Sequence, residues 1–181
     1  MANTTWETIR PAAKMDLDEV EAAALAAATE VSISAVSHLL TTADMSSAIW
    51  NTVGSHEVFT VTGAVRLRMW VICTDTLADA ANLATIKLGL EGEDNYFIAL
   101  TNAAGKGGLA IDAGEFWRAP VNNYSRETFS NILFDTAIGF GQDVGYTIGG
   151  EALTGGVLEF HCTWEAMSAD GHVAVGNGAS L

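Results

Sequence analysis

The stretch GGVLEFHCTWEAM, residues 155–167, carries the clearest strand pattern in the chain. Polar residues stand between large apolar ones at Leu158, Phe160, Cys162 and Trp164. Residues two apart lie on the same face of a strand. The stretch therefore predicts a strand with one face buried and the other turned toward solvent.

The same period of two recurs through most of the chain after residue 57. It is plainest in residues 57–75 and returns in the shorter segments 84–92, 95–101, 109–119 and 130–150. Turns rich in Gly, Asn and Asp separate these segments. Short strands at this spacing favour an antiparallel β-sandwich or jelly roll. We expect this β domain to span residues 51–181.

Residues 1–50 have a different character. We expect an arm over residues 1–15, interrupted by Pro11, and one short helix over residues 16–30. The helix prediction follows from acidic residues at its start and an alanine-rich sequence with helical spacing. Residues 31–40 fit either a strand or a helix.

The chain has 181 residues and a net charge of −14, with only eight Lys and Arg against 22 Asp and Glu. This length suits one domain with an appended arm. The negative field repels phosphate backbones and anionic lipid surfaces, so we expect no nucleic-acid or membrane partner. No run approaches the ~18–20 apolar residues of a membrane-spanning helix.

Reactive residue types are present, but their spacing predicts no shared site. His161 and Cys162 are neighbours on a strand and must project to opposite faces, so they cannot bind one metal ion together. No CxxC or HxxxH pair and no GxSxG motif occurs. The glycine-rich runs at 102–108 and 139–145 read as turns. We therefore expect no catalytic residue, cofactor or metal, and Cys73 and Cys162 are expected to be buried thiols.

Aromatic and arm residues are the candidates for partner contacts. In the arm, Trp6 and Ile9 are large apolar residues and Arg10 adds positive charge, so the arm is expected to dock on a neighbouring subunit. Trp117 and Tyr124 are further candidates, and they also leave open a carbohydrate-binding role.

Four segments carry a resemblance to a known class of protein: VTGAVRLRMWVICTDTL (61–77), ATIKLGLEGEDNYFIALT (84–101), AIDAGEFW (110–117) and DVGYTIGGEALTGGVLEFHCTWEAMSADGHVAV (143–175). Across residues 57–176 the chain resembles small structural proteins of tailed bacteriophages that decorate or cement the capsid head. The resemblance covers the strand-rich part and not the first fifty residues.

The resemblance implies a virion structural protein on the capsid exterior, with no enzymatic activity and no cofactor. Its expected partners are the major capsid protein and further copies of itself, as a homotrimer. The competing expectations are a tail or fibre protein, a carbohydrate-binding β-sandwich module and, less favoured, a small β-barrel enzyme.

Overall fold

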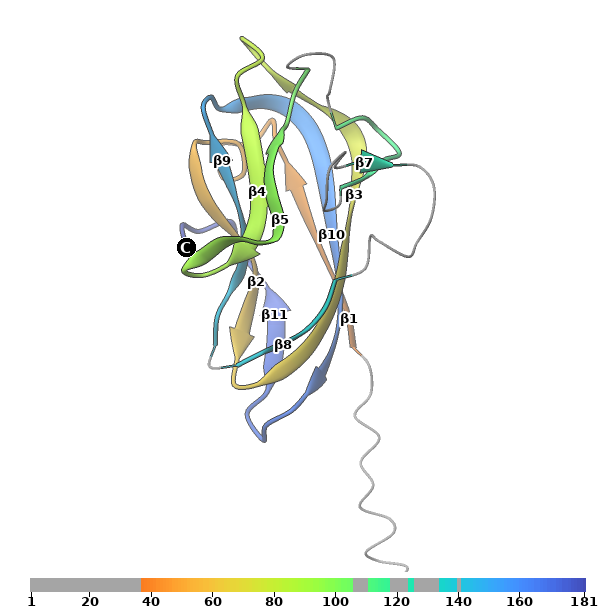
Figure 1. Ribbon diagram of the computed structural model, residues 1–181, viewed down its shortest axis with the longest axis vertical. Coiled ribbons are helices and arrows are strands. Elements are labelled where there is room, and N and C mark those ends of the chain that lie inside the picture. Colours follow the sequence, from red (N-terminus) through yellow and green to blue (C-terminus); the bar gives the residue numbers. More distant parts are fainter. Residues whose placement is uncertain (1–36, 106–110, 118–123, 126–133, 140) are drawn as a thin grey trace, which may run out of the picture. The chain divides into compact units, whose positions relative to one another are not determined.

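Figure 1 shows the computed structural model of the chain, which describes residues 37–105, 111–117, 124–125, 134–139 and 141–181. Its strands are β1 (Ser37–Asp44), β2 (Gly54–Thr62), β3 (Val65–Asp79), β4 (Thr85–Leu90), β5 (Glu93–Asn102), β6 (Phe116–Trp117), β7 (Tyr124–Ser125), β8 (Phe134–Ile138), β9 (Val144–Gly149), β10 (Leu153–Ala166) and β11 (His172–Val175).

The strands form two antiparallel sheets. One sheet, called sheet A, has the order β1-β10-β3-β6-β7, and β8 pairs with another part of β3. The other, sheet B, has the order β11-β2-β9-β4-β5. The prediction of a mainly β protein with two antiparallel sheets is confirmed. A jelly-roll topology stays a prediction, and the predicted helix at residues 16–30 lies outside the described residues.

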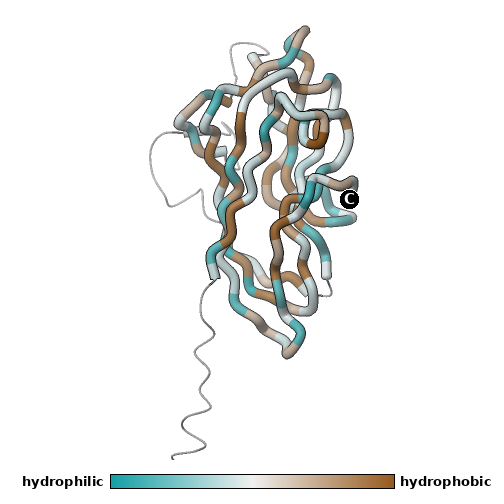
Figure 2. The backbone as a smooth tube through the Cα atoms, turned by 180° about the vertical axis from the view of Figure 1, so that it is seen from behind, coloured by the Kyte–Doolittle hydropathy of each residue, from teal (hydrophilic) through white to brown (hydrophobic). Residues whose placement is uncertain are grey.

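The stretch at residues 155–167 forms most of β10, which lies between β1 and β3 in sheet A. Cys162 is opposite Leu39 of β1 and Met69 of β3. Phe160 and Cys162 are completely buried, whereas the intervening His161 is partly exposed. The alternation therefore identified the inner face of the strand correctly, and Figure 2 shows the same change of hydropathy along the strands.

The core lies between the two sheets. Sheet A contributes residues such as Leu67 and Phe160, and sheet B contributes Phe59, Leu88 and Tyr146, all of them fully buried. Each large apolar side chain removed from water contributes about 1.5–3 kcal/mol to folding. Because these side chains are buried between the sheets, the opposite face of each sheet points outward. Only residues on the outer faces and in the loops can contact a partner.

The first part of β10 is irregular and requires a glycine at one position. The pairing of β10 with β3 shifts register between Leu153 and Leu158. Within this irregular stretch Gly156 has φ +104°, and a Cβ there would lie 2.7 Å from the Cα of Leu77. The Gly156 carbonyl accepts a hydrogen bond from the backbone N–H of Met45, which attaches the loop after β1 to β10.

The sandwich begins earlier than the predicted boundary at residue 50. β1 starts at Ser37 and pairs with β10 along its whole length, from Ser37 opposite Trp164 to Asp44 opposite Val157. The sequence of residues 31–40 fitted either a strand or a helix, and residues 37–40 form a strand. Residues 31–36 lie outside the described residues.

Candidate functional site

The predicted partner contacts have different outcomes. Trp6, Ile9 and Arg10 lie outside the described residues, and of Tyr124 the structure describes only the backbone, paired with Trp117. Trp117 itself is 0% exposed, and its indole N–H donates to Thr101 Oγ1 at 3.4 Å. Its prediction as a partner or sugar contact is wrong, because a fully buried ring offers no surface.

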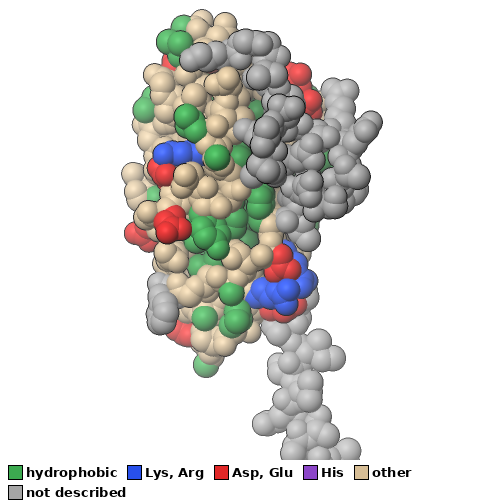
Figure 3. All heavy atoms as spheres, in the orientation of Figure 1, with side chains coloured by type: hydrophobic (Ala, Val, Ile, Leu, Met, Phe, Trp, Pro, Cys, Tyr) green, Lys and Arg blue, Asp and Glu red, His purple; other side chains and the backbone are tan. Residues whose placement is uncertain are grey.

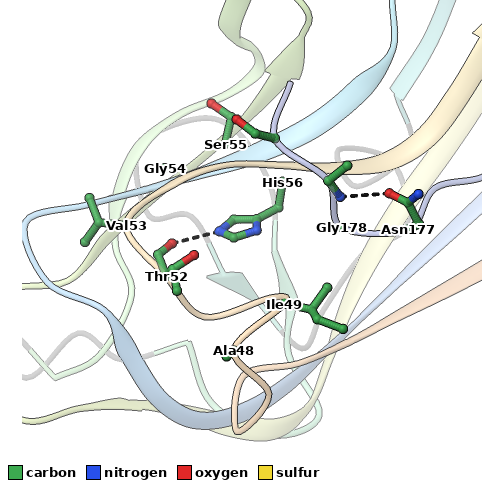
Figure 4. A pocket seen from close by; sticks show the side chains of 11 residues that line it. Ala48, Ile49, Thr52, Val53, Gly54, Ser55, His56, Asn177 and Gly178 are labelled. Atoms are coloured by element: carbon green, nitrogen blue, oxygen red, sulfur yellow. Dashed lines mark hydrogen bonds between the residues drawn. The ribbon is translucent and has the colours of Figure 1, made fainter.

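A hollow lies between the segment that joins β1 to β2 and the C-terminal residues (Figure 4). We call it the loop pocket. It measures about 550 Å³ and is lined by Ala48, Ile49, Thr52, Val53, Gly54, Ser55, His56, Asn177, Gly178, Ala179 and Ser180. The sequence does not reveal this pocket, because its two walls come from segments that are far apart in the sequence, residues 48–56 and residues 177–180.

Backbone and side-chain hydrogen bonds hold both walls of the loop pocket. On the C-terminal side, Glu57 N–H donates to the Ala179 carbonyl at 2.8 Å, and Gly178 N–H donates to the Glu57 carbonyl at 3.1 Å. On the other side, the hydroxyl of Tyr146 donates to the Trp50 carbonyl at 2.6 Å. The pocket is therefore a fixed feature of the sandwich and not a gap between loose loops.

His56 lies in the middle of the loop pocket (Figure 4) and is only 4% exposed. Its Nε2 is 2.7 Å from the Thr52 carbonyl, so Nε2 carries the proton and donates it. Nδ1 is then an acceptor, and it is buried without a hydrogen-bond partner. The ring also stacks on Tyr146, with centroids 5.1 Å apart. A buried acceptor left unpaired is unfavourable.

The rim of the loop pocket is apolar. Ile49 is 57% exposed and Val53 is 58% exposed, which is high for large aliphatic side chains. A concave surface that combines apolar walls with a few placed polar groups is typical of a binding site. The loop pocket can therefore receive an apolar group.

A second group of side chains stands on the outer face of sheet A. Trp70 of β3 and His161 of β10 are direct neighbours in the register and stack with centroids 5.1 Å apart and an interplanar angle of 2°. His38 of β1 packs beside both rings. The prediction that the His161 side chain faces outward is confirmed, but its meeting with His38 was missed because it depends on strand register.

The two thiols are unsuited to nucleophilic chemistry. Cys73 and Cys162 are both free and buried, as the sequence predicts. Burial raises the pKa of each thiol from 9.0 to about 12. Both are protonated near neutral pH, and the thiolate is the reactive form.

An ion-pair network also lies on sheet A. Asp135 of β8 accepts hydrogen bonds from Arg66 at 2.9 Å and from Arg68 at 3.0 Å. Hydrogen bonds from Arg66 and then Arg68 lower the pKa of Asp135 from 3.8 to about 2. Figure 3 shows basic and acidic side chains in contact at the lower right of the displayed face. All three side chains are more than a third exposed, so solvent screens the pairs and their stabilisation is small.

Among the described residues, no group of three or more His, Cys, Asp or Glu side chains is arranged to hold a metal ion. Within those residues, no helix is long and apolar enough to cross a membrane.

Comparison with known proteins adds little. No protein-family model matches the chain, and no curated protein matches it. Among solved structures, it is similar to a chain described as "Acidic stable capsid structure of Helicobacter pylori bacteriophage KHP30". The identity is 13%, the TM-score is 0.46, and the match covers 76% of this chain and 92% of that chain. Likeness at this level assigns neither a function nor a partner to the protein.

Proposed function

We propose that this protein is a non-catalytic structural component of a phage virion, which decorates the outside of the capsid head and stabilises it through subunit contacts. The observation that carries the proposal is the resemblance of residues 57–176 to head decoration proteins. The four segments with this resemblance contribute strands to both sheets, so the likeness extends through the body of the sandwich.

The loop pocket supplies a docking surface for this role. We assign it to an exposed segment of the major capsid protein that places an aliphatic or aromatic side chain between Ile49 and Val53. Interfaces draw most of their energy from a few such buried contacts.

The N-terminal arm gives a second attachment. Residues 1–15 hold Arg10 and Lys14 against the single acid Glu7, whereas the whole chain carries a net charge of −14. A basic arm on an acidic protein favours docking on acidic neighbours, including further copies of the same chain. Two linked attachments slow dissociation far more than either one alone.

A homotrimer on the capsid surface fits this arrangement. A stable contact buries on the order of 1,000 Å² or more, which three copies at a capsid junction achieve together. A non-catalytic role also fits the thiols, because burial keeps both Cys73 and Cys162 protonated near neutral pH.

The test of docking uses capsids assembled without this protein. Purified full-length protein is added to them, and the bound fraction is measured by co-sedimentation. Combining Ile49→Asp with Val53→Asp should weaken binding at least about ten-fold, because each aliphatic contact is worth roughly 1.5 kcal/mol or more. Leu100→Asp is the matched control, since Leu100 is 62% exposed on β5 and outside the pocket. Native protein that does not bind capsids overturns the proposed function.

The arm is tested separately. Deleting residues 1–15 should weaken capsid binding and leave the thermal transition of the sandwich in place. Light scattering coupled to gel filtration measures the oligomer, and a trimer is the expected result. A monomer at working concentration contradicts the trimer, and unchanged capsid binding after the deletion contradicts the role of the arm.

A further inference from the structure

The outer face of sheet A brings two imidazoles together. β1 and β10 pair antiparallel with His38 opposite Thr163, so His38 and His161 are diagonal neighbours on the same face. Nε2 of His38 lies 3.4 Å from Nδ1 of His161. His38 is exposed, so the pair is open to solvent.

The distance between the two nitrogens matches a particular coordination geometry. Two imidazole nitrogens that bind one tetrahedral zinc ion, each at about 2.0–2.1 Å, stand about 3.3 Å apart. Two nitrogens at right angles on a square-planar copper or nickel ion stand closer, at about 2.9 Å. The separation of 3.4 Å between His38 and His161 is close to the tetrahedral value. The ring centroids are 5.6 Å apart, so the two nitrogens point almost straight at each other, and the His38 ring must turn before both can face one ion.

The surroundings of His161 also suit a metal ligand. Its second nitrogen, Nε2, lies 3.4 Å from Oε2 of Glu159 and makes no hydrogen bond. A histidine that binds a metal through one nitrogen commonly directs the other at a carboxylate, which fixes the ring and makes it a better ligand. Stacking on Trp70 holds the same ring in place.

We propose that His38 and His161 form a zinc-binding site on the outer face of sheet A, with Glu159 as the supporting carboxylate. The ion takes the place of the proton that the two imidazoles share, after a small rotation of the exposed His38 ring. Water fills the remaining positions, because the described residues offer no third ligand here. The chain's net charge of −14 favours a cation, and the nearby Arg68 is already paired with Asp135.

The test titrates the full-length chain, purified without a polyhistidine tag, with zinc chloride alone by isothermal calorimetry. One saturable zinc per chain is expected. His38→Ala and His161→Ala should each weaken binding by at least about ten-fold, and Glu159→Gln by about ten-fold. Cobalt(II), added in place of zinc, should give the intense visible absorption of a tetrahedral site.

The matched control is His172→Ala. His172 is an exposed histidine packed edge-on against Trp164, with centroids 5.3 Å apart, but it has no second imidazole beside it. Its loss should leave zinc affinity unchanged. If His161→Ala lowers the melting temperature, His38→Ala decides the matter, since the His38 side chain is outside the core. Absence of saturable binding, native affinity in His38→Ala, or an equal loss in His172→Ala overturns the proposal.

Discussion

Tyr146→Phe probes the contact that ties the loop pocket to the core. The hydroxyl of Tyr146 donates to the Trp50 carbonyl at 2.6 Å, and its ring stacks on His56 and on Phe160, with centroids 5.1 and 5.5 Å away. Tyr146 is completely buried. The substitution removes one oxygen atom and leaves all the ring contacts, so it isolates the hydrogen bond.

The expected loss follows from what the substitution leaves behind. The Trp50 carbonyl loses its hydroxyl donor in a part-buried setting, which costs about 1–3 kcal/mol. No large cavity forms, because the ring remains. For a domain of this size, that loss lowers the melting temperature by roughly 3–10 °C.

Urea denaturation followed by circular dichroism measures the change in the free energy of unfolding. Tyr96→Phe is the control, because the hydroxyl of Tyr96 is 3.0 Å from Thr136 Oγ1 but the residue is 47% exposed. Its loss should stay within about 0.5 kcal/mol. The reasoning fails if Tyr146→Phe is as stable as the native protein, or if the two substitutions cost the same.

Three further outcomes are expected. Burial raises the pKa of Cys162 from 9.0 to about 12, so its contribution to stability is complete below pH 9 and is lost as the pH rises toward 12; Cys162→Ala should flatten this alkaline loss in denaturation curves taken at several pH values. The pKa of Asp135 is lowered from 3.8 to about 2, so its contribution is complete above pH 3.8 and is lost as the pH falls toward 2; Asp135→Asn should flatten that acid limb, and an unchanged limb refutes the assignment. Gly156→Ala should cost about 1–3 kcal/mol, because φ is +104° and the new methyl meets Leu77; Gly155→Ala, where a Cβ meets open space, should be close to neutral in the same thermal assay.

The sandwich was predictable where alternation is local and clean. β3 and β10 bury every second residue over much of their length, and a short window of sequence reveals that pattern. β1 was harder to predict from the sequence, because one of its inward-facing residues is the polar Thr41, which is 3% exposed. Its hydroxyl donates to the Val58 carbonyl of β2 at 2.9 Å, so a polar residue is satisfied inside the core. No pattern within β1 signals that distant partner.

The candidate sites depend on contacts that sequence spacing does not contain. The loop pocket joins residues 48–56 to residues 177–180, and only the folded sheet brings them together. Alternation places His161 on the outer face, but its pairing with His38 requires the register of β1 against β10. Trp117 was misjudged because β6 has only two residues, too few to show which face is buried.

The position of β10 between β1 and β3 has a consequence for how the chain is made. Ser37 must wait for Trp164 before it acquires its partner, and β2 likewise pairs with β11 near the end of the chain. Such long-range pairings delay folding and leave apolar faces uncovered in the meantime. A nascent chain on the ribosome therefore lacks the strand between β1 and β3 until residue 166 has been synthesised, and termination before that point leaves an aggregation-prone fragment without a complete sheet A.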